Sequence, residues 1–528
     1  MYDYAIKNGM IVDGTGAEPY RAAVYLQGDK IAKITAEDLP AKETVDAAGL
    51  AVAPGFMDMH THSDTTPYCA PGFETALTQG LTFHLGGNCG GSLVPNMPEE
   101  HLNVGVSSAK SRFKKPMETY DAYDFASYCD EVEKNGVAVN FSTLIGHGRL
   151  RRCVMADPKA TLPTAEELKG MEELLEKQLK QGAPGMSIGL TYVPGTFAET
   201  EELIALSKVV AKYNGIVAVH MRSESTEVME AVDEMCRVAK ESGAHVHISH
   251  FKLMYEAQWG RAEELLRKLD ETRAAGANIT ADQYPYEASS TGAVSLLPMN
   301  MKANHAMAME YLMDDAKYAQ VRDDMEKKIN SRGGGARIGI SRTDGVMPEA
   351  DGKTLAEIAD MLGMPVVDAF REIMRRSECK SGLIYYAINE QDMLTIAKRQ
   401  DIAVASDGYG YDNLVEGPIG KPHPRSAGAF TRFLRLAREH QLMPLEKAVR
   451  KMTGLPASLL GIKDRGVLKE GNFADVVIFD PETITDNATF AEPTKPATGV
   501  KCVFVNGVKA FVDGKPTGSR SGRFLTLQ

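Results

Sequence analysis

The sequence predicts an α/β protein whose centre is a (β/α)8 barrel of the TIM type. Through the middle of the chain, apolar runs rich in strand-forming residues alternate with helix-like stretches. Eight such runs can be counted, which is the number of strands that closes this barrel. A doubly wound open sheet is the alternative for the same alternation. The runs are Val52–His62, Leu81–Gly90, Val139–Gly148, Met186–Tyr192, Ile216–Met221, His245–Lys252, Asn278–Tyr284 and Ile402–Asp407.

The two ends of the chain differ from the middle, because both read as short strands and tight turns. They predict one small β-sandwich domain formed by both termini, residues 1–50 and 465–528, with the barrel in residues 51–464. The gap between strands 7 and 8 is too long for one helix. We therefore expect an inserted segment at residues 288–342, a candidate lid over the barrel.

The helix-like stretches have the apolar spacing of amphipathic helices. The clearest runs from Thr164 to Gln181, where Thr164 and Glu167 make a capping box. Its apolar face comprises Leu168, Met171, Leu174, Leu175 and Leu179. Further helices are expected at Glu199–Tyr213, Ser225–Ser242 and Arg261–Ala275.

Charge and composition argue against several classes of partner. The formal net charge of −12 disfavours nucleic acid, since phosphate binding needs a clustered positive face. No apolar run has membrane-spanning length, and the alternating start of the chain is unlike a secretory signal. The seven cysteines are scattered and odd in number, as in reduced cytoplasmic proteins. We expect a cytoplasmic protein, and no sequence feature fixes its oligomeric state.

Polar side chains end several of the predicted strands, and strand ends face the active site of a barrel. His60 and His62 end the first run and point the same way, so both imidazoles can reach one metal ion. The simpler alternative is a hydrogen-bonded histidine pair. His220 and His250 end the fifth and sixth runs, and Asp407 ends the eighth.

Each of these residues alone also has an ordinary explanation, such as Asp407 capping the next helix. Four separate strands that end in His or Asp at one face are harder to explain that way. His245 and His247 point away from His250 and are expected to be structural. Cys89 lies in a glycine-rich turn after the second run, either as a buried thiol or as a zinc thiolate.

At these residues the sequence resembles the amidohydrolase superfamily and, within it, the D-aminoacylases, which are N-acyl-D-amino-acid deacylases. The resemblance runs essentially from end to end. His60-x-His62 marks only the superfamily, whereas the cysteine turn and two proline-containing segments are more specific to the aminoacylase branch. The matching segments are Asn8–Gly16, Pro54–Phe56 with Asp58, Gly87–Gly90, Gly189–Gly195, His220–Arg222, Ser249–Lys252, Asp282–Tyr286, Ser406–Gly408 and His423–Arg425.

The resemblance implies a metal centre that binds Zn²⁺. Cys89, His220 and His250 correspond to the ligands of a tightly held zinc ion, and His60 and His62 to a second, weaker site. Asp407 corresponds to the general base and acid. Many superfamily members bridge two metals with a carboxylated lysine on strand 4. The fourth run here has no lysine, and the cysteine is expected to take its place, so the metal count stays open.

The same resemblance implies a subsite for a substrate carboxylate, formed by Lys252, Tyr284 and Arg425, with Tyr192 and Ser289 nearby. Cations and phenols suit a carboxylate, because they hold it with charge-assisted bonds. The alternative for the two cations is a solvated surface. The loop Tyr409–Pro422 is longer than in the family, and Arg425 is followed by the small residues Ser426–Gly428. The apolar stretch Ala293–Pro298 favours an apolar over an acidic substrate side chain.

The function implied is zinc-dependent hydrolysis of the amide bond of small N-acyl-D-amino acids. Cyclic amides (hydantoin, dihydropyrimidine or dihydroorotate rings) and dipeptides with a D-residue are the alternative substrates, although hydantoinase-like enzymes generally use the lysine of strand 4. A deaminase is a weaker alternative. From a different class, the chain could be an inactive, hydantoinase-like scaffold that binds partners. The preference for D over L follows from the resemblance alone.

Overall fold

Parallel strands form the centre of the molecule in the computed structural model, which describes residues 1–96, 101–412 and 418–526. The barrel strands are β8 (Phe56–Asp58), β9 (Leu81–Gly86), β10 (Asn140–Thr143), β12 (Gly185–Gly189), β13 (Ile216–His220), β14 (His245–Ile248), β15 (Ile279–Gln283) and β19 (Ile402–Val404). The short strand β11 (Ile145–Gly146) follows β10 and pairs with β12, which joins the β8–β10 sheet to the β12–β19 sheet.

The barrel closes between its first and last strands. The Asp407 N–H donates to the His60 carbonyl at 2.9 Å, and the His62 N–H donates to the Gly408 carbonyl at 2.8 Å. The predicted (β/α)8 barrel is therefore confirmed, and the open sheet is excluded.

Each predicted run overlaps a barrel strand. The third run contains the short strand β11 as well as β10, and the first run overlaps β7 (Ala51–Pro54) and β8, of which β7 lies outside the barrel. Strand β7 pairs with β20 (Val476–Phe479) in the terminal domain. The chain crosses to the barrel at Gly55, where any Cβ would lie 2.2 Å from the Thr82 side chain. Residues 51–54 thus pair in the sandwich sheet, although the sequence had placed them in the barrel.

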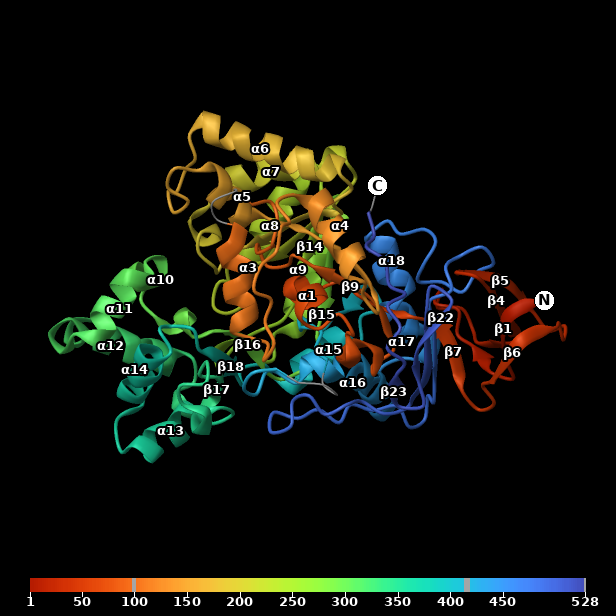
Figure 1. Ribbon diagram of the computed structural model, residues 1–528. Helices are drawn as coiled ribbons and strands as arrows, with labels where there is room; N and C mark the ends of the chain where they lie inside the picture. The colour runs from red at the N-terminus through yellow and green to blue at the C-terminus, as the bar shows by residue number, and fades with distance from the viewer. Residues whose placement is uncertain (97–100, 413–417, 527–528) are drawn as a thin grey trace.

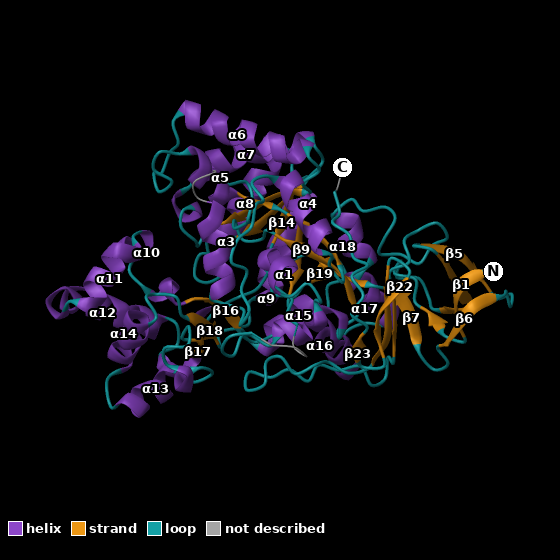
Figure 2. Ribbon diagram, in the orientation of Figure 1, coloured by secondary structure: helices purple, strands orange, loops and turns teal. Residues whose placement is uncertain are grey.

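Helices surround the strands (Figure 2). The capping box at Thr164 is confirmed: Thr164 Oγ1 accepts the Glu167 N–H at 3.1 Å, and Glu167 Oε2 accepts the Thr164 N–H at 2.8 Å. The barrel helices and the shorter ones between strands are α1 (Thr66–Cys69), α2 (Glu74–Leu77), α3 (His101–Lys110), α4 (Phe125–Asn135), α5 (His147–Val154), α6 (Ala165–Lys180), α7 (Thr200–Lys212), α8 (Val228–Ser242), α9 (Ala262–Ala274), α15 (Glu390–Ala397), α16 (Arg425–Glu439), α17 (Leu445–Met452) and α18 (Gly454–Leu459). None of the described helices is both long and apolar enough to cross a membrane.

Both termini build the second unit, seen at the right of Figure 1, where red and blue strands lie side by side. One sheet has the order β5–β4–β1–β6, and the other the order β23–β22–β21–β20–β7–β2–β3. A shared core that includes Ile6, Val24, Ile478 and Phe504 fills the space between them, as in a β-sandwich. Its remaining strands are β1 (Tyr2–Lys7), β2 (Met10–Ile11), β3 (Tyr20–Arg21), β4 (Ala23–Gln27), β5 (Lys30–Thr35), β6 (Ala41–Asp46), β21 (Val500–Val505), β22 (Val508–Val512) and β23 (Lys515–Pro516).

The insertion between strands 7 and 8 forms a separate lobe at the left of Figure 1. It contains β16 (Ser289–Gly292), α10 (Met299–Ala303), α11 (His305–Met313), α12 (Asp315–Ser331), β17 (Ile338–Arg342), α13 (Leu355–Leu362), α14 (Val366–Arg376) and β18 (Gly382–Tyr385). The lobe extends beyond residue 342, where the sequence had ended it, because β18 pairs with both β16 and β17 and is the central strand of this sheet.

Candidate metal centre and active site

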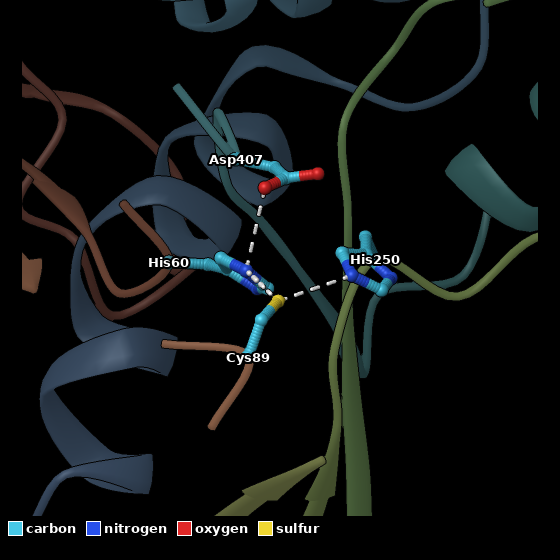
Figure 3. A group of neighbouring side chains, drawn as sticks. All are labelled: His60, Cys89, His250 and Asp407. Carbon is cyan, nitrogen blue, oxygen red and sulfur yellow. Dashed lines mark hydrogen bonds and ion pairs between the residues drawn. The ribbon is translucent and has the colours of Figure 1, made fainter. Parts of the chain in front are cut away.

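Side chains from the carboxyl ends of the barrel strands converge at one point (Figure 3). His60 follows β8, Cys89 follows β9, His250 follows β14 and Asp407 follows β19, and all four are buried. Their ligand atoms, one from each residue, all lie within 4.8 Å of one another. The sequence-predicted residues at these strand ends are thus brought together.

Cys89 occupies the middle of this group. Its Sγ lies 3.5 Å from His60 Nε2 and 3.5 Å from His250 Nε2. Ser187 on β12 holds the cysteine turn, because its hydroxyl accepts the Gly90 N–H at 3.0 Å and donates to the Gly87 carbonyl. Strand 4 therefore contributes a hydroxyl that supports the turn.

His220 belongs to a second group, with Glu224 and His250, that shares one imidazole with the first. Glu224 Oε1 lies 2.8 Å from His250 Nδ1, and its Oε2 lies 3.9 Å from His220 Nε2. Glu224 also forms an ion pair with Lys252. Sequence reasoning missed Glu224, which sits four residues after His220 in a loop with no pattern that would single out one glutamate.

Three residues of the site have left-handed backbone conformations. The φ angles are 55° at Cys89, 39° at His250 and 51° at Asp407. Each lies just after its strand, and the reversal turns the side chain from the strand end toward the centre of the barrel mouth. L-residues adopt this conformation at a cost, so local strain accompanies the geometry of the site.

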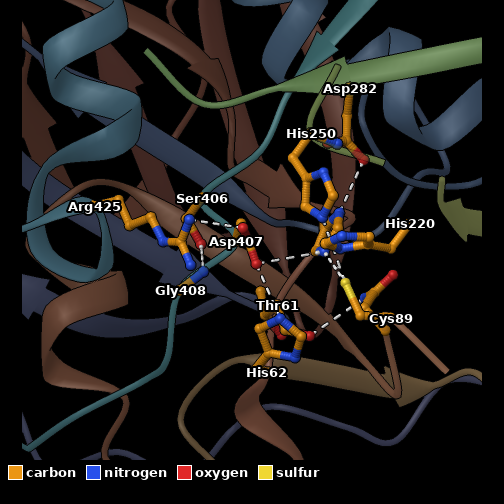
Figure 4. Close-up of polar contacts among 12 residues, drawn as sticks. Thr61, His62, Cys89, His220, His250, Asp282, Ser406, Asp407, Gly408 and Arg425 are labelled. Atoms are coloured by element: carbon orange, nitrogen blue, oxygen red, sulfur yellow. Dashed lines mark hydrogen bonds and ion pairs between the residues drawn. The ribbon is translucent and has the colours of Figure 1, made fainter. Parts of the chain in front are cut away.

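Asp282 on β15 organises the floor of the site (Figure 4). Its Oδ2 lies 3.2 Å from His60 Nδ1 and 2.9 Å from His247 Nε2, and its Oδ1 accepts the His250 N–H at 2.7 Å. His247, expected to be structural, contacts this carboxylate and Thr280. Because Asp282 holds Nδ1 of His60, the other ring nitrogen, Nε2, faces the cluster.

The electrostatics of the cluster suit a cation. Burial raises the pKa of the Cys89 thiol, but the imidazoles of His60 and His250 outweigh it and hold that pKa well below its usual range. Burial likewise opposes charge on His60, yet Asp282 and Cys89 raise the pKa of this imidazole to about 10. Protons on imidazoles balance the buried anions here, and a divalent ion can take their place.

The donor set fits zinc. Sulfur, imidazole nitrogen and carboxylate oxygen are the ligand types that Zn²⁺ takes in proteins. His220 Nδ1 is buried and has no hydrogen-bond partner among the described residues. The thiolate form favoured for Cys89 is also the form that binds metal.

Asp407 lies between the metal cluster and a buried guanidinium. Its Oδ1 is 2.9 Å from His62 Nε2, and its Oδ2 is 2.6 Å from Arg425 Nη1. Burial alone would raise the pKa of Asp407, but Arg425 and the hydrogen bond from His62 hold it well below its usual range. The carboxylate is therefore ionised and can accept a proton.

The three residues proposed for a carboxylate lie together beside Asp407. Lys252 and Arg425 are each 4% exposed, so neither is a solvated surface cation. They flank the ring of Tyr284, with Arg425 Cζ 4.7 Å and Lys252 Nζ 5.5 Å from its centroid. The buried Tyr284 hydroxyl has no partner among the described residues, which leaves a donor for an incoming group.

Tyr192 and Ser289 lie at the edge of this group. The Tyr192 ring is 4.9 Å from that of His220, and its hydroxyl receives a 3.4 Å hydrogen bond from Thr291 of the insertion. Ser289 is buried, and its hydroxyl lies 3.9 Å from Met254 Sδ. The insertion thus meets the barrel mouth near the site.

The chain belongs to the amidohydrolase family, whose profile matches residues 43–362 and 409–511. It is 37% identical to an N-acyl-D-glutamate deacylase from Alcaligenes xylosoxydans xylosoxydans, over 99% of this chain and 96% of that protein. A D-aminoacylase from the same organism is 34% identical, over 99% of this chain and 97% of that protein.

A solved structure of similar fold is the N-acyl-D-glutamate deacylase from Bordetella bronchiseptica, complexed with zinc and a phosphonate inhibitor that mimics the tetrahedral intermediate. Its TM-score is 0.84, with 34% sequence identity over 99% of both chains. The family expected from the sequence is confirmed.

Proposed function

We propose that this chain is a zinc-dependent deacylase that hydrolyses the amide bond of N-acyl-D-amino acids. The products are a carboxylic acid and a free D-amino acid. The observation that carries the proposal is the buried Cys89–histidine–Asp407 cluster with the Arg425, Tyr284 and Lys252 group directly beside it. Relatives named as D-amino-acid deacylases over nearly the whole chain support the same chemistry and handedness.

The metal ligands we propose are Cys89, His220 and His250 for a tightly held zinc ion, and His60 and His62 for a second, weaker site. Cys89 lies equally far from His60 and His250, so it can serve either position. When bound, such an ion supplies Lewis acidity, which acidifies water and polarises a carbonyl group.

Asp407 acts as general base and then as general acid. It accepts a proton from the water that attacks the amide carbon, and it returns that proton to the leaving nitrogen as the C–N bond breaks. Its buried carboxylate is ionised beside Arg425, as the first step requires. His62 Nε2 lies 2.9 Å from the other carboxylate oxygen, so a metal ion bound by His62 would adjoin the base.

The substrate carboxylate binds to Arg425, Lys252 and the Tyr284 hydroxyl, with Tyr192 and Ser289 at the edge. Two buried cations, together with a phenol that has no partner among the described residues, can make charge-assisted bonds to a carboxylate. This contact fixes the amide bond relative to Asp407, so that proton transfer occurs within one bound geometry.

The test is a panel of N-acetyl-D- and N-acetyl-L-amino acids, assayed for free amine with zinc quantified on the same sample. Turnover of the D-series by the zinc-loaded protein supports the proposal. Zinc without turnover of either series rejects it in favour of hydantoins or D-dipeptides, which are assayed alongside. A zinc-free protein without activity supports the inactive scaffold.

We also propose that the enzyme works in the cytoplasm on small, freely diffusing substrates. All seven cysteines are free thiols, as expected where the cell keeps them reduced. The insertion of residues 289–385 is the candidate lid, since it contacts Tyr192 at the barrel mouth.

A further inference from the structure

His423 joins two chain segments that carry the proposed carboxylate subsite. Its side chain is buried, and each ring nitrogen contacts a backbone group. Nδ1 accepts the Arg425 N–H at 3.1 Å, and Nε2 donates to the Ala288 carbonyl at 2.9 Å. Arg425 is the first residue of α16, and Ala288 directly precedes Ser289 at the start of the insertion. One imidazole thus connects the arginine that pairs with Asp407 to the start of the insertion.

These two hydrogen bonds fix the tautomer of the His423 ring. A backbone N–H donates, so Nδ1 must carry a lone pair, and the Ala288 carbonyl requires the proton on Nε2. Burial, together with the positive charge of Arg425, holds the pKa of His423 well below its usual range, which keeps the ring neutral. The neutral ring satisfies one of the N–H groups that the first turn of a helix leaves without a partner.

Three aromatic rings pack around His423. The ring centroids of Tyr286, Phe490 and Tyr284 lie 5.0, 5.1 and 6.1 Å from that of the histidine. The interplanar angles are 85°, 77° and 60°, in the edge-to-face arrangement that aromatic pairs favour. Tyr284 is also the ring that the two cations of the subsite flank. The same histidine therefore contacts the backbone of the subsite arginine and the ring of the subsite phenol.

Phe490 comes from the terminal domain. It lies in the excursion of residues 480–499, which leaves the domain after β20 and returns to it at β21 (Figure 1). The two arms of the excursion pair where Thr485 and Thr498 exchange backbone hydrogen bonds, both at 3.0 Å. The Phe490 ring also lies 5.1 Å from that of Tyr386, which follows β18 of the insertion. The barrel, the insertion and the terminal domain therefore meet at this histidine.

Three arginines of α16 bind the excursion. Arg435 Nε lies 2.8 Å from Asp486 Oδ1, and Arg432 Nη1 lies 3.5 Å from Oδ2 of the same carboxylate. Arg438 Nη1 donates to the Pro481 carbonyl at 2.9 Å. Residues three apart lie on one face of a helix, so one face of α16 carries all these contacts. The helix that begins with the subsite arginine is thus attached to the terminal domain along its length.

The small residue Gly428 permits this packing. It lies three residues after Arg425, and a Cβ there would come 2.7 Å from the Tyr286 hydroxyl and 3.0 Å from Cβ of Asp486. A larger residue would push Tyr286 or the excursion away from α16. The small residues that follow Arg425 in the sequence therefore make room for Tyr286 and for the excursion.

We propose that His423 is a positioning residue of the carboxylate subsite, and that Phe490 holds its ring, so that the terminal domain helps to place Arg425. This inference rests on the proposed deacylase function. His423 acts through the Arg425 backbone and the Tyr284 ring and does not itself touch the substrate. Because the substrate carboxylate is bound in the ground state and in the transition state alike, loss of His423 should raise KM more than it lowers kcat.

The experiment measures KM and kcat of zinc-loaded variants for the N-acetyl-D-amino acid that the wild type hydrolyses best. His423→Leu removes both hydrogen bonds. His423→Asn keeps an acceptor near the position of Nδ1, whereas His423→Gln keeps a donor near Nε2 for the Ala288 carbonyl. Phe490→Ala removes the ring from the terminal domain. The matched control is Lys495→Ala, which removes an exposed lysine that pairs with Glu492 on the same excursion. KM does not depend on the fraction of the sample that is folded, so a loss of stability alone leaves it unchanged.

We expect KM of His423→Leu to rise about 10- to 100-fold, the effect of one misplaced charge-assisted contact, with a smaller fall in kcat. His423→Asn should stay closer to the wild-type KM than His423→Gln, because it keeps the bond to the Arg425 N–H. Phe490→Ala should raise KM by less than His423→Leu, and Lys495→Ala should keep the wild-type value.

A wild-type KM in His423→Leu, or a fall in kcat at constant KM, overturns the role of His423. If His423→Leu does not fold, equal KM values for His423→Asn and His423→Gln overturn it instead. A wild-type KM in Phe490→Ala overturns the part assigned to the terminal domain. These outcomes leave the deacylase in place, whereas no turnover of any D-substrate by the wild type rejects the proposed function itself.

Discussion

Replacement of Asp282 by asparagine tests how the metal ligands are oriented. The carboxylate accepts three hydrogen bonds, from His60 Nδ1, His247 Nε2 and the His250 N–H, at 3.2, 2.9 and 2.7 Å. Asparagine has the same shape but only one acceptor oxygen. If that oxygen keeps the His250 N–H, the amide NH₂ faces two imidazole nitrogens that both donate in the native arrangement.

The conflict is relieved if His60 moves its proton from Nδ1 to Nε2. Nε2 is the atom 3.5 Å from Cys89 Sγ and 3.5 Å from Asp407 Oδ1, and a protonated nitrogen cannot bind a metal ion. Loss of one such orienting carboxylate typically weakens metal binding 10- to 100-fold, or roughly 1.4 to 2.8 kcal/mol. We therefore expect the zinc ion of the second site, which His60 would bind, to leave Asp282→Asn at chelator concentrations about 10- to 100-fold lower than in the wild type.

The assay is competition with a chelator, followed by zinc quantification on the desalted protein. Thr280→Val is the matched control on the same strand, since Thr280 contacts His245 and His247 but none of the proposed ligands. Its zinc affinity should stay within a few-fold of the wild type. The reasoning is refuted if Asp282→Asn, folded as judged by its melting curve, keeps the zinc content and chelator midpoint of the wild type.

Three further predictions concern the base, the thiolate and a buried lysine. Asp407→Asn should keep its zinc and lose about 10²- to 10⁴-fold in kcat, and an active variant contradicts the assigned role. Cys89→Ser should lose the thiolate-to-metal absorption band of the cobalt-substituted protein, whereas an unchanged spectrum means that the sulfur does not bind the metal. Burial lowers the pKa of Lys451 to about 7. The unfolded chain then takes up a proton as the pH falls below about 10.5, and the folded protein does not until about pH 7. Stability should therefore rise from pH 7 to 10 by up to roughly 5 kcal/mol, and Lys451→Met should flatten that rise in urea-unfolding midpoints.

Much of the barrel could be predicted because its strands are buried on both faces and read as apolar runs. The start of the helix after Thr164 could also be predicted, because its capping box involves residues only three positions apart. The first run was predicted as one strand, but the chain passes from one sheet to the other at Gly55 without a break in apolar character. The end of the insertion misled because β18 pairs with strands about 40 and 90 residues earlier, and no local pattern records such pairing.

The residues of the site likewise fall into those that the sequence could predict and those that it could not. Strand ends located Cys89, His250 and Asp407, since each follows a run that the sequence shows plainly. Glu224 could not be singled out, because its importance comes from Lys252 and His250, which the fold brings to it. The role of Asp282 was equally hidden, although the residue lies in a matched segment. Its three hydrogen bonds come from three different elements.

The left-handed turns after the barrel strands have a consequence for how this family can change. At three of these turns the backbone conformation would be roughly 1 kcal/mol lower in free energy with glycine than with the residue present, which is Cys89, His250 or Asp407. A change to glycine at such a position removes the functional side chain and also relieves the backbone strain. The backbone conformation therefore does not oppose the loss of the side chain. A descendant freed from its substrate can therefore shed its active site early and still persist as a well-folded barrel available for other tasks.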